Sequence, residues 1–198
     1  ILPAFAGYVP KAFAEAHPKA RIYKMRSWEG FEGTYWLDPS DPLFAPLAKR
    51  FLDLYTAEYG AEQYYLADAF NEMVPPIAED GSDTAHASYG AATANTPALD
   101  AATKAAALTR EVRDARLAAY GQRLYASIAS ARPDATWVMQ GWLFGADKKF
   151  WSPDAIAAFL RDVPDGKMLI LDIGNDRYPG IWKTTNGFDG KNWVYGYV

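Results

Sequence analysis

Three apolar stretches of this sequence end in polar or aromatic side chains that could take part in acid–base chemistry. The stretch from Tyr64 to Met73 carries Asn71 and Glu72 near its end, and two later stretches end in Gln140 with Trp142 and in Asn175 with Asp176. If these stretches are parallel strands, their carboxyl ends meet at one rim, where loops converge on a shared crevice. A single acidic residue after a strand more often caps a loop. The prediction of a site therefore depends on the three strand ends lying together.

Two carboxylates on different strands, with aromatic side chains between them, are typical of sites that cleave glycosidic bonds. One carboxyl is kept protonated and donates to the leaving oxygen, while the other stays ionised and faces the sugar carbon. Glu72 and Asp176 would be this pair. Asp68 and Asp172 also lie on predicted strands, but the alternation of side chains favours buried structural carboxylates, hydrogen-bonded inside the barrel, at both positions.

The elements that must position these residues alternate between strand and helix. Apolar runs predict strands at 1–6, from 64 onward, and at 136–140, 168–173 and 193–198. Apolar residues at helical spacing predict helices at 41–60, 99–131 and 152–163. Alternation of this kind is typical of parallel βαβ units, and the five strands predict α/β architecture as a segment of a (β/α)8 TIM-like barrel. A doubly wound sheet is the alternative, but no glycine-rich phosphate loop supports it.

Two segments are predicted to lack regular structure. The polar and aromatic segment 21–36 has no sustained periodicity and predicts a long loop on the same rim as Glu72, carrying Trp28. The segment at about 77–98 is rich in Ala, Ser, Thr, Asp and Gly, which predicts a long loop insertion. We expect residues 1–198 to form part of one catalytic domain, because a complete barrel of this kind needs about 250 residues.

The composition narrows the classes of function. The chain has 50% apolar and 22% charged residues, as expected of a globular protein with a real core. A net charge of −4 without a basic cluster argues against a nucleic-acid partner, and no apolar run reaches the roughly 18 residues of a membrane span. Aromatic residues reach 15%, with 7 Trp and 13 Tyr. Such a content favours a ligand with apolar faces and polar edges, such as a sugar ring.

Metal and cofactor chemistry finds little support in the sequence. There is no cysteine, which excludes thiolate metal sites and a cysteine nucleophile. His17 precedes a proline and His86 lies in the predicted loop insertion, so neither is a convincing metal ligand or general base. A serine triad lacks both its sharp strand-to-helix turn and its histidine. We expect neither a metal nor a cofactor.

Several motifs resemble, in order and at compatible spacing, the signatures of one enzyme family. They are Leu2-Pro3-Ala4-Phe5-Ala6-Gly7-x-Val9-Pro10, Ala67-Asp68-x-Phe70-Asn71-Glu72-Met73-x-Pro75-Pro76, Trp137-x-Met139-Gln140-Gly141-Trp142-Leu143-Phe144, Phe150-Trp151 and Leu171-Asp172-Ile173. Together they resemble the α-N-acetylglucosaminidases of glycoside hydrolase family 89. The resemblance implies a (β/α)8 barrel that removes terminal α-linked N-acetylglucosamine from glycans with retention, in a secreted or periplasmic protein.

The resemblance also implies roles for individual residues. Glu72 matches the family's acid/base, and Asp176 falls where the family usually has its nucleophilic glutamate. Tyr8 replaces the family's usual histidine in the first motif. The residues expected to contact the sugar are Asn71, Trp142, Trp28, Tyr8 and Gln140. A carbohydrate-binding relative of the same barrel family, impaired in catalysis by the aspartate at 176, is the alternative.

Overall fold

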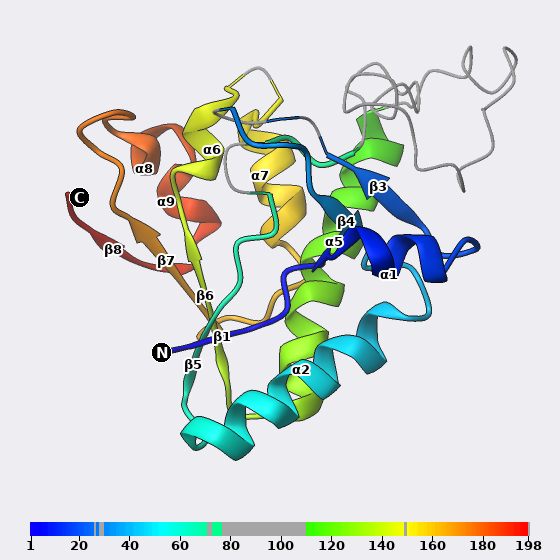
Figure 1. Ribbon diagram of the computed structural model, residues 1–198. Helices are drawn as coiled ribbons and strands as arrows, with labels where there is room; N and C mark the ends of the chain where they lie inside the picture. The colour runs from blue at the N-terminus through cyan, green and yellow to red at the C-terminus, as the bar shows by residue number, and fades with distance from the viewer. Residues whose placement is uncertain (26, 28–29, 71–72, 77–109, 149, 198) are drawn as a thin grey trace, which may run out of the picture.

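The central feature of the fold is a parallel sheet. The computed structural model describes residues 1–25, 27, 30–70, 73–76, 110–148 and 150–197 (Figure 1). Within these ranges, five strands pair in the order β1 (Leu2–Pro3), β5 (Tyr64–Leu66), β6 (Thr136–Gln140), β7 (Met168–Asp172) and β8 (Asn192–Tyr195). All four pairings are parallel. The predicted succession of parallel strands is confirmed.

Three helices cover one face of this sheet: α2 (Phe44–Tyr59), α5 (Arg110–Ala131) and α7 (Pro153–Leu160) (Figure 1). The sequence signals at the helix ends explain their bounds. The Ser152 hydroxyl accepts a hydrogen bond from Ala155 N at the start of α7, and Gly60 ends α2 with a φ of 84°. The start predicted for α2 was wrong by three residues. The Asp41 carboxylate accepts a hydrogen bond from Leu43 N and closes a turn ahead of the helix.

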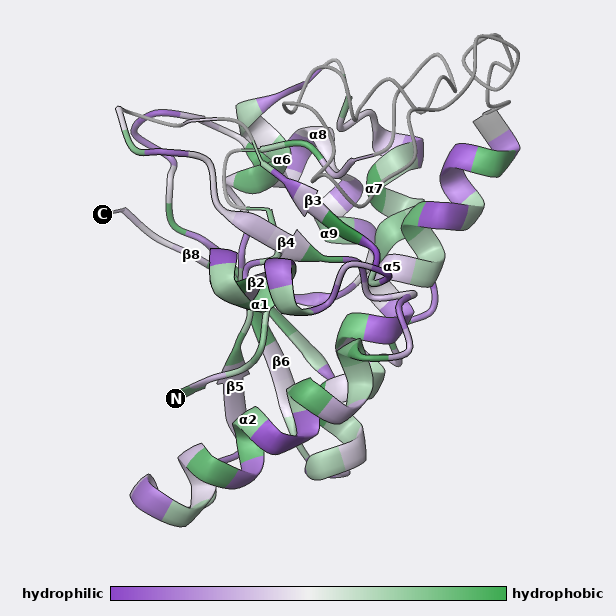
Figure 2. Ribbon diagram, turned by 45° about the vertical axis from the view of Figure 1, so that its right-hand side comes forward, coloured by the Kyte–Doolittle hydropathy of each residue, from purple (hydrophilic) through white to green (hydrophobic). Residues whose placement is uncertain are grey.

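The two faces of the sheet differ in burial, as strand alternation requires. Met168, Ile170 and Asp172 of β7 are buried against the helices, whereas Leu169 and Leu171 are half-buried on the other face. No helix among the described residues covers that second face (Figure 2). This arrangement is that of a barrel wall, with helices outside and an apolar inner surface inside.

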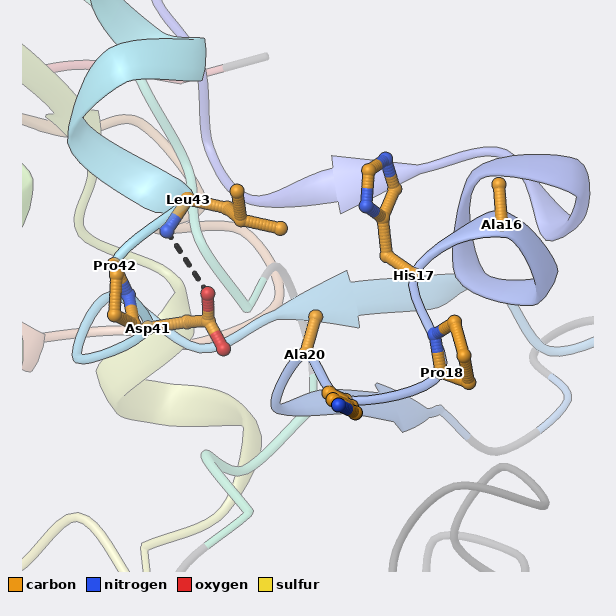
Figure 3. A pocket seen from close by; sticks show the side chains of 8 residues that line it. Ala16, His17, Pro18, Ala20, Asp41, Pro42 and Leu43 are labelled. Carbon is orange, nitrogen blue, oxygen red and sulfur yellow. Dashed lines mark hydrogen bonds between the residues drawn. The ribbon is translucent and has the colours of Figure 1, made fainter.

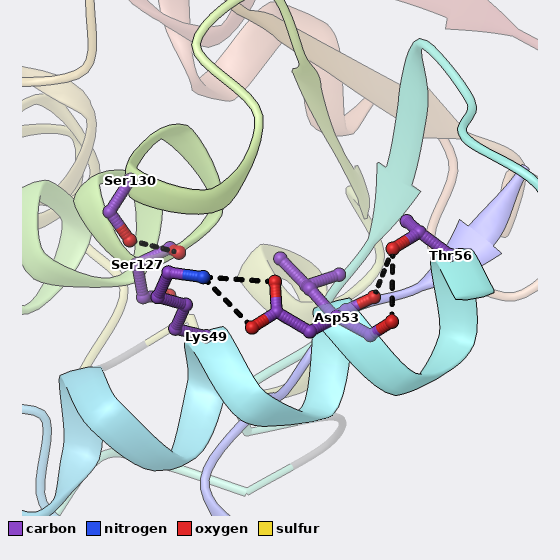
Figure 4. A network of polar contacts seen from close by, with 6 residues as sticks. Lys49, Asp53, Thr56, Ser127 and Ser130 are labelled. Atoms are coloured by element: carbon purple, nitrogen blue, oxygen red, sulfur yellow. Dashed lines mark hydrogen bonds and ion pairs between the residues drawn. The ribbon is translucent and has the colours of Figure 1, made fainter.

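The polar contacts on α2 and α5 that Figure 4 draws are local to each helix, whereas the buried Tyr120 hydroxyl of α5 donates to Asp38 Oδ2 at 2.9 Å. Lys49 Nζ lies 2.8 Å from Asp53 Oδ2, the Thr56 hydroxyl donates to Leu52 O, and the Ser130 hydroxyl donates to Ser127 O. Each of these local contacts joins residues three or four apart, so it adds little to the packing between the helices. Apolar side chains supply that packing, and those buried on the two helices include Phe44, Ala48, Leu52, Leu117, Leu124 and Ile128. None of the described helices is both long and apolar enough to span a membrane.

A small antiparallel sheet corrects the loop predicted at 21–36. It contains β2 (Tyr8–Val9), β4 (Tyr35–Leu37) and β3 (Ile22–Lys24), in that order, and the helix α1 (Lys11–Ala16) lies between β2 and β3. These strands are too short to show a period in the sequence. The burial of Trp36 stabilises them, because its Nε1 donates to Ala6 O at 2.9 Å and its side chain is fully enclosed.

The connection from β7 to β8 contains two short helical turns, α8 (Ile181–Thr184) and α9 (Asn186–Asp189). The turn residues predicted before the last strand, Asn186-Gly187 and Asp189-Gly190, adopt left-handed backbone conformations. Phe188 shares this conformation, with a φ of 55°, and its ring is fully buried against Phe144 and Trp193. Burial of this ring offsets a strain of about 1–2 kcal/mol for a left-handed non-glycine residue.

Candidate active site

The carboxyl ends of β5 and β6 bring together three polar side chains. Asp68 follows β5, and its Oδ1 accepts a hydrogen bond of 2.7 Å from the backbone N–H of Gln140 at the end of β6. Burial raises the pKa of Asp68, and the hydrogen bonds from Gln140 offset part of that rise. Burial and the negative charge of Asp68 together raise the pKa of Tyr8 to about 12. Tyr8 and Gln140, both predicted at the site, therefore lie around Asp68.

This group combines a neutral phenol with a carboxylate. Because its pKa is raised, Tyr8 keeps its proton at any physiological pH and can donate a hydrogen bond. Asp68 is half-buried and accepts hydrogen bonds when ionised. A donor beside an acceptor suits the hydroxyl and amide groups of a sugar. Sequence reasoning gave Asp68 a structural role only, although alternation from Leu66 already places its side chain on the inner face of the sheet.

The end of β6 packs tightly on the segment that follows β7. A Cβ added to Gly174 would lie 3.0 Å from Trp142 Cβ and 3.3 Å from Trp142 Cε3. Trp142 precedes the short helix α6 (Leu143–Ala146), and a Cβ added to Gly145 of that helix would lie 2.8 Å from Tyr178 Cβ. Glycine at 174 and 145 thus allows the two segments to touch. Trp142 itself is half-buried.

Asp176 lies in a hydrogen-bonded turn beside Trp142. The carbonyl of Gly174 accepts hydrogen bonds from Arg177 N at 3.2 Å and from Tyr178 N at 2.8 Å. Asn175 is buried within this turn, whereas Asp176 is exposed. The structure therefore places the half-buried Trp142 and the exposed Asp176 on segments that follow adjacent strands and that touch at Gly174.

Asp172 is buried, as alternation predicted, but the position inside the barrel and the hydrogen bonds expected for its carboxylate are wrong. It is fully buried on the helix side of β7, and neither of its carboxylate oxygens makes a hydrogen bond to a described residue. Burial raises the pKa of Asp172, and the nearby Asn175 amide and Trp182 backbone N–H offset part of that rise. The side chain of Asp172 therefore faces away from the inner surface of the sheet.

Three predicted site residues, Asn71, Glu72 and Trp28, lie outside the described residues. The positions that flank the first two are well packed. Phe70 is fully buried, Met73 is nearly so, and Met73 N donates to Phe70 O at 2.8 Å. Within the described part of the chain, no group of three or more carboxylate or imidazole side chains could hold a metal ion.

A hollow of about 370 Å³ lies away from this rim, beside α1 and ahead of α2 (Figure 3). Its lining includes His17, Lys19 and Asp41 but none of the residues predicted at the site. The Asp41 carboxylate already accepts backbone hydrogen bonds from Arg21 and Leu43, at 2.6 and 2.9 Å, and the His17 ring packs on Phe13. These polar groups are structural.

The sequence and the fold both match proteins of one family. Residues 1–198 match the family model described as the α-N-acetylglucosaminidase (NAGLU) TIM-barrel domain. The chain belongs to this family. It is 33% identical over 199 residues to the α-N-acetylglucosaminidase of Homo sapiens, and the match covers 98% of this chain and 22% of that protein. The family member described here thus spans about a fifth of the length of its curated relative.

The same fold occurs in solved structures from Clostridium perfringens. A family 89 glycoside hydrolase in complex with PUGNAc matches with a TM-score of 0.60 and 18% identity, covering 98% of this chain and 17% of that one. A variant in complex with its substrate, GlcNAc-α-1,4-galactose, matches with the same TM-score and 17% identity, over the same shares of the two chains. The parallel strands with helices on one side are part of an α/β barrel, as the sequence predicted.

Proposed function

We propose that the full-length protein is a retaining glycoside hydrolase that removes terminal non-reducing α-linked N-acetylglucosamine from glycans by double displacement. The family match over residues 1–198 is the observation that carries this proposal. The exposed Asp176 beside Trp142, on a rim shared with Tyr8 and Asp68, supports it. We also propose that residues 1–198 form part of a single (β/α)8 catalytic domain with a loop insertion at about 77–98.

The stereochemistry of the substrate explains why two carboxylates are needed. In an α-glycoside of N-acetylglucosamine, the 2-acetamido group lies on the same face of the ring as the leaving group. It therefore cannot attack the sugar carbon from behind, and a protein carboxylate must do so. Retaining enzymes place their two carboxyls about 5–5.5 Å apart for this purpose.

Glu72 and Asp176 would divide the reaction between them. In the first step, the Asp176 carboxylate attacks C1 to form a β-linked ester while Glu72 donates its proton to the leaving oxygen. In the second step, the Glu72 carboxylate takes a proton from water, which attacks C1 and releases Asp176. The product keeps the α configuration, and both carboxyls return to their starting protonation states.

The other rim residues would hold the sugar. Trp142 offers a partly exposed indole for stacking on the ring, and Trp28 is proposed as a second aromatic contact. The Tyr8 hydroxyl would donate to the sugar, with Asn71 and Gln140 contributing further hydrogen bonds. The solved relative from Clostridium perfringens binds GlcNAc-α-1,4-galactose, and we propose a glycan with the same terminal α-linked sugar as the substrate here.

Release of 4-nitrophenol from its α-N-acetylglucosaminide tests the proposal in the full-length protein. We expect Glu72→Gln and Asp176→Asn each to lower kcat/KM by about 10²-fold or more. Asp134→Asn is the control, because Asp134 is an exposed carboxylate at the opposite end of β6. Hydrolysis that survives both rim substitutions would refute the assignment. A parent protein that binds N-acetylglucosamine without turnover would instead support the carbohydrate-binding alternative.

A further inference from the structure

Asn175 ties together three segments of the chain immediately before Asp176. Its Nδ2 donates to the carbonyl of Asp172 at the end of β7 and, at 3.1 Å, to the carbonyl of Gly196 just after β8. Its Oδ1 accepts from Gly180 N at 3.4 Å, directly ahead of α8. Only 4% of its surface is exposed. Both the nitrogen and the oxygen of the amide are therefore hydrogen-bonded to main-chain groups.

This set of partners requires an amide side chain of this length. An aspartate has no donor for the two carbonyls, an alanine has neither donor nor acceptor, and a glutamine carries its amide one methylene further out. A buried polar group left without its partner costs about 1–3 kcal/mol, so the native orientation of Asn175 is strongly favoured. The backbone at residue 175 is consequently fixed in position relative to the ends of β7 and β8.

Asp176 depends on that backbone more than a longer side chain would. A single methylene joins its carboxyl to its Cα, so the position of the carboxyl follows the main chain closely. The turn is also held on either side of this pair, by Gly174 against Trp142 and by Tyr178 against Gly145. The Asn175 amide also joins this turn to the end of β8, through its hydrogen bond to Gly196 O. A misplacement of about 1 Å at a reacting group can cost about 10²-fold in rate.

We infer that Asn175 is a positioning residue for the proposed nucleophile: its side-chain amide joins the turn that carries Asp176 to the ends of β7 and β8 and so fixes the distance from the carboxyl to the sugar carbon. This inference rests on the proposed role of Asp176. It assigns Asn175 no contact with the substrate.

A double-mutant cycle with azide tests the inference in the full-length protein. In Asp176→Gly, azide can take the place of the missing carboxylate: a bond forms between nitrogen and C1 as the bond from C1 to the 4-nitrophenol oxygen breaks, giving a β-glycosyl azide. Asn175→Ala is then introduced into the parent and into Asp176→Gly, and hydrolysis by the first is compared with azide-dependent turnover by the second. Azide diffuses freely, so its attack does not depend on the position of residue 176.

We expect Asn175→Ala to lower kcat of the parent by about 10–100-fold and azide-dependent turnover by no more than about twofold, the usual error of additivity. Equal losses in both backgrounds would overturn the inference and make Asn175 a structural residue only. Absence of glycosyl azide from Asp176→Gly would instead refute Asp176 as the nucleophile, and the inference with it. Hydrolysis by the parent shows separately whether the proposed function holds.

Two further variants show whether a loss of activity comes from misfolding and not from the position of Asp176. Asn175→Asp keeps the shape of the side chain but loses both donors, and we expect it to give the same pattern if Asn175→Ala does not fold. Asn192→Ala removes an exposed asparagine from the opposite end of β8 and should leave both rates unchanged. A loss of kcat in Asn192→Ala equal to that in Asn175→Ala would overturn the inference.

Discussion

Gly121 of α5 lies directly against the backbone of Phe159 in α7, and its replacement by alanine has two opposing effects on stability. A Cβ at this position would lie 1.9 Å from Phe159 O and 3.1 Å from Phe159 C. The helices would have to separate by more than about 1 Å, in a core packed as densely as an organic crystal. Alanine is favoured over glycine inside a helix by about 1 kcal/mol, which acts in the opposite direction.

The steric effect should dominate. Phe159 packs on Trp137, Phe70 and Trp151, so a shift of α7 would disturb the layer that supports β6. Overpacking of this kind costs about 1–3 kcal/mol and occasionally more, and backbone atoms cannot rotate away. After subtraction of the helix propensity, we expect a net loss of about 2 kcal/mol in the free energy of unfolding.

Thermal unfolding and amide hydrogen exchange of the full-length protein measure this effect. We expect a lower Tm and faster exchange in α5 and α7 for Gly121→Ala. Gln122→Ala is the matched control, because Gln122 is exposed on the same helix and its replacement tests helix propensity without a clash. A Gly121→Ala protein as stable as the parent, or more stable, would show that the steric argument is wrong.

Three further predictions concern the rim. Trp137→Phe removes the 2.8 Å hydrogen bond from Nε1 to Ala67 O and should lower the free energy of unfolding in urea by about 2–4 kcal/mol; an unchanged urea midpoint would contradict this. Asp172 has a raised pKa in the folded state, so it costs stability increasingly as the pH rises above its ordinary value of 3.8. Asp172→Asn should therefore have a higher Tm than the parent at pH 8, and the difference should shrink toward pH 3.8. A difference that is constant with pH would refute the titration. Tyr8→Phe should lower kcat/KM by up to about tenfold, because it removes one hydrogen bond to the sugar. The pH profile of kcat/KM should keep the same shape below pH 10, because the pKa of Tyr8 is about 12. If a fall in kcat/KM between neutral pH and pH 10 disappeared in this variant, the protonated state assigned to Tyr8 would be wrong.

The main sheet could be predicted from the sequence because its signals are local. The strand β7 appears as a nearly continuous apolar run at 168–173, which packs on helices with one face and is half-buried on the other, and the helix boundaries carry Ser152 and Gly60. The small antiparallel sheet gives no such signal. Its strands contain two or three residues, and Tyr8 pairs with Trp36, 28 positions further along the chain. No periodicity within 21–36 could reveal that partner.

The same distinction between local and distant signals applies to the site. The rule that parallel strands end at one rim predicts Trp142 and Asp176 on neighbouring segments, and the segments after β6 and β7 do touch, at Gly174 and Trp142. It could not show that Asp68 acts on Tyr8, because that proximity depends on the small sheet. The rule named Asn175 at the rim but could not show its role, because its amide is satisfied partly by Gly196, 21 residues later. Its position beside a candidate nucleophile was the available signal.

The three junctions between β5, β6, β7 and β8 each have a link at this rim. Asp68 joins β5 to β6 through Gln140 N, Trp142 packs β6 against Gly174 after β7, and Asn175 joins β7 to the end of β8. Neighbouring strands lie about 4.8 Å apart, so the ends of β5 and β7 are separated by about 10 Å. The proposed retaining pair would need its carboxyls at about half that distance, so its two side chains would have to close the gap. Glutamate after β5 has two methylenes for this, whereas aspartate after β7 has one. The shorter side chain can succeed only if its turn is held in place, which is why the links on both sides of β7 belong to the same functional argument as the carboxylates.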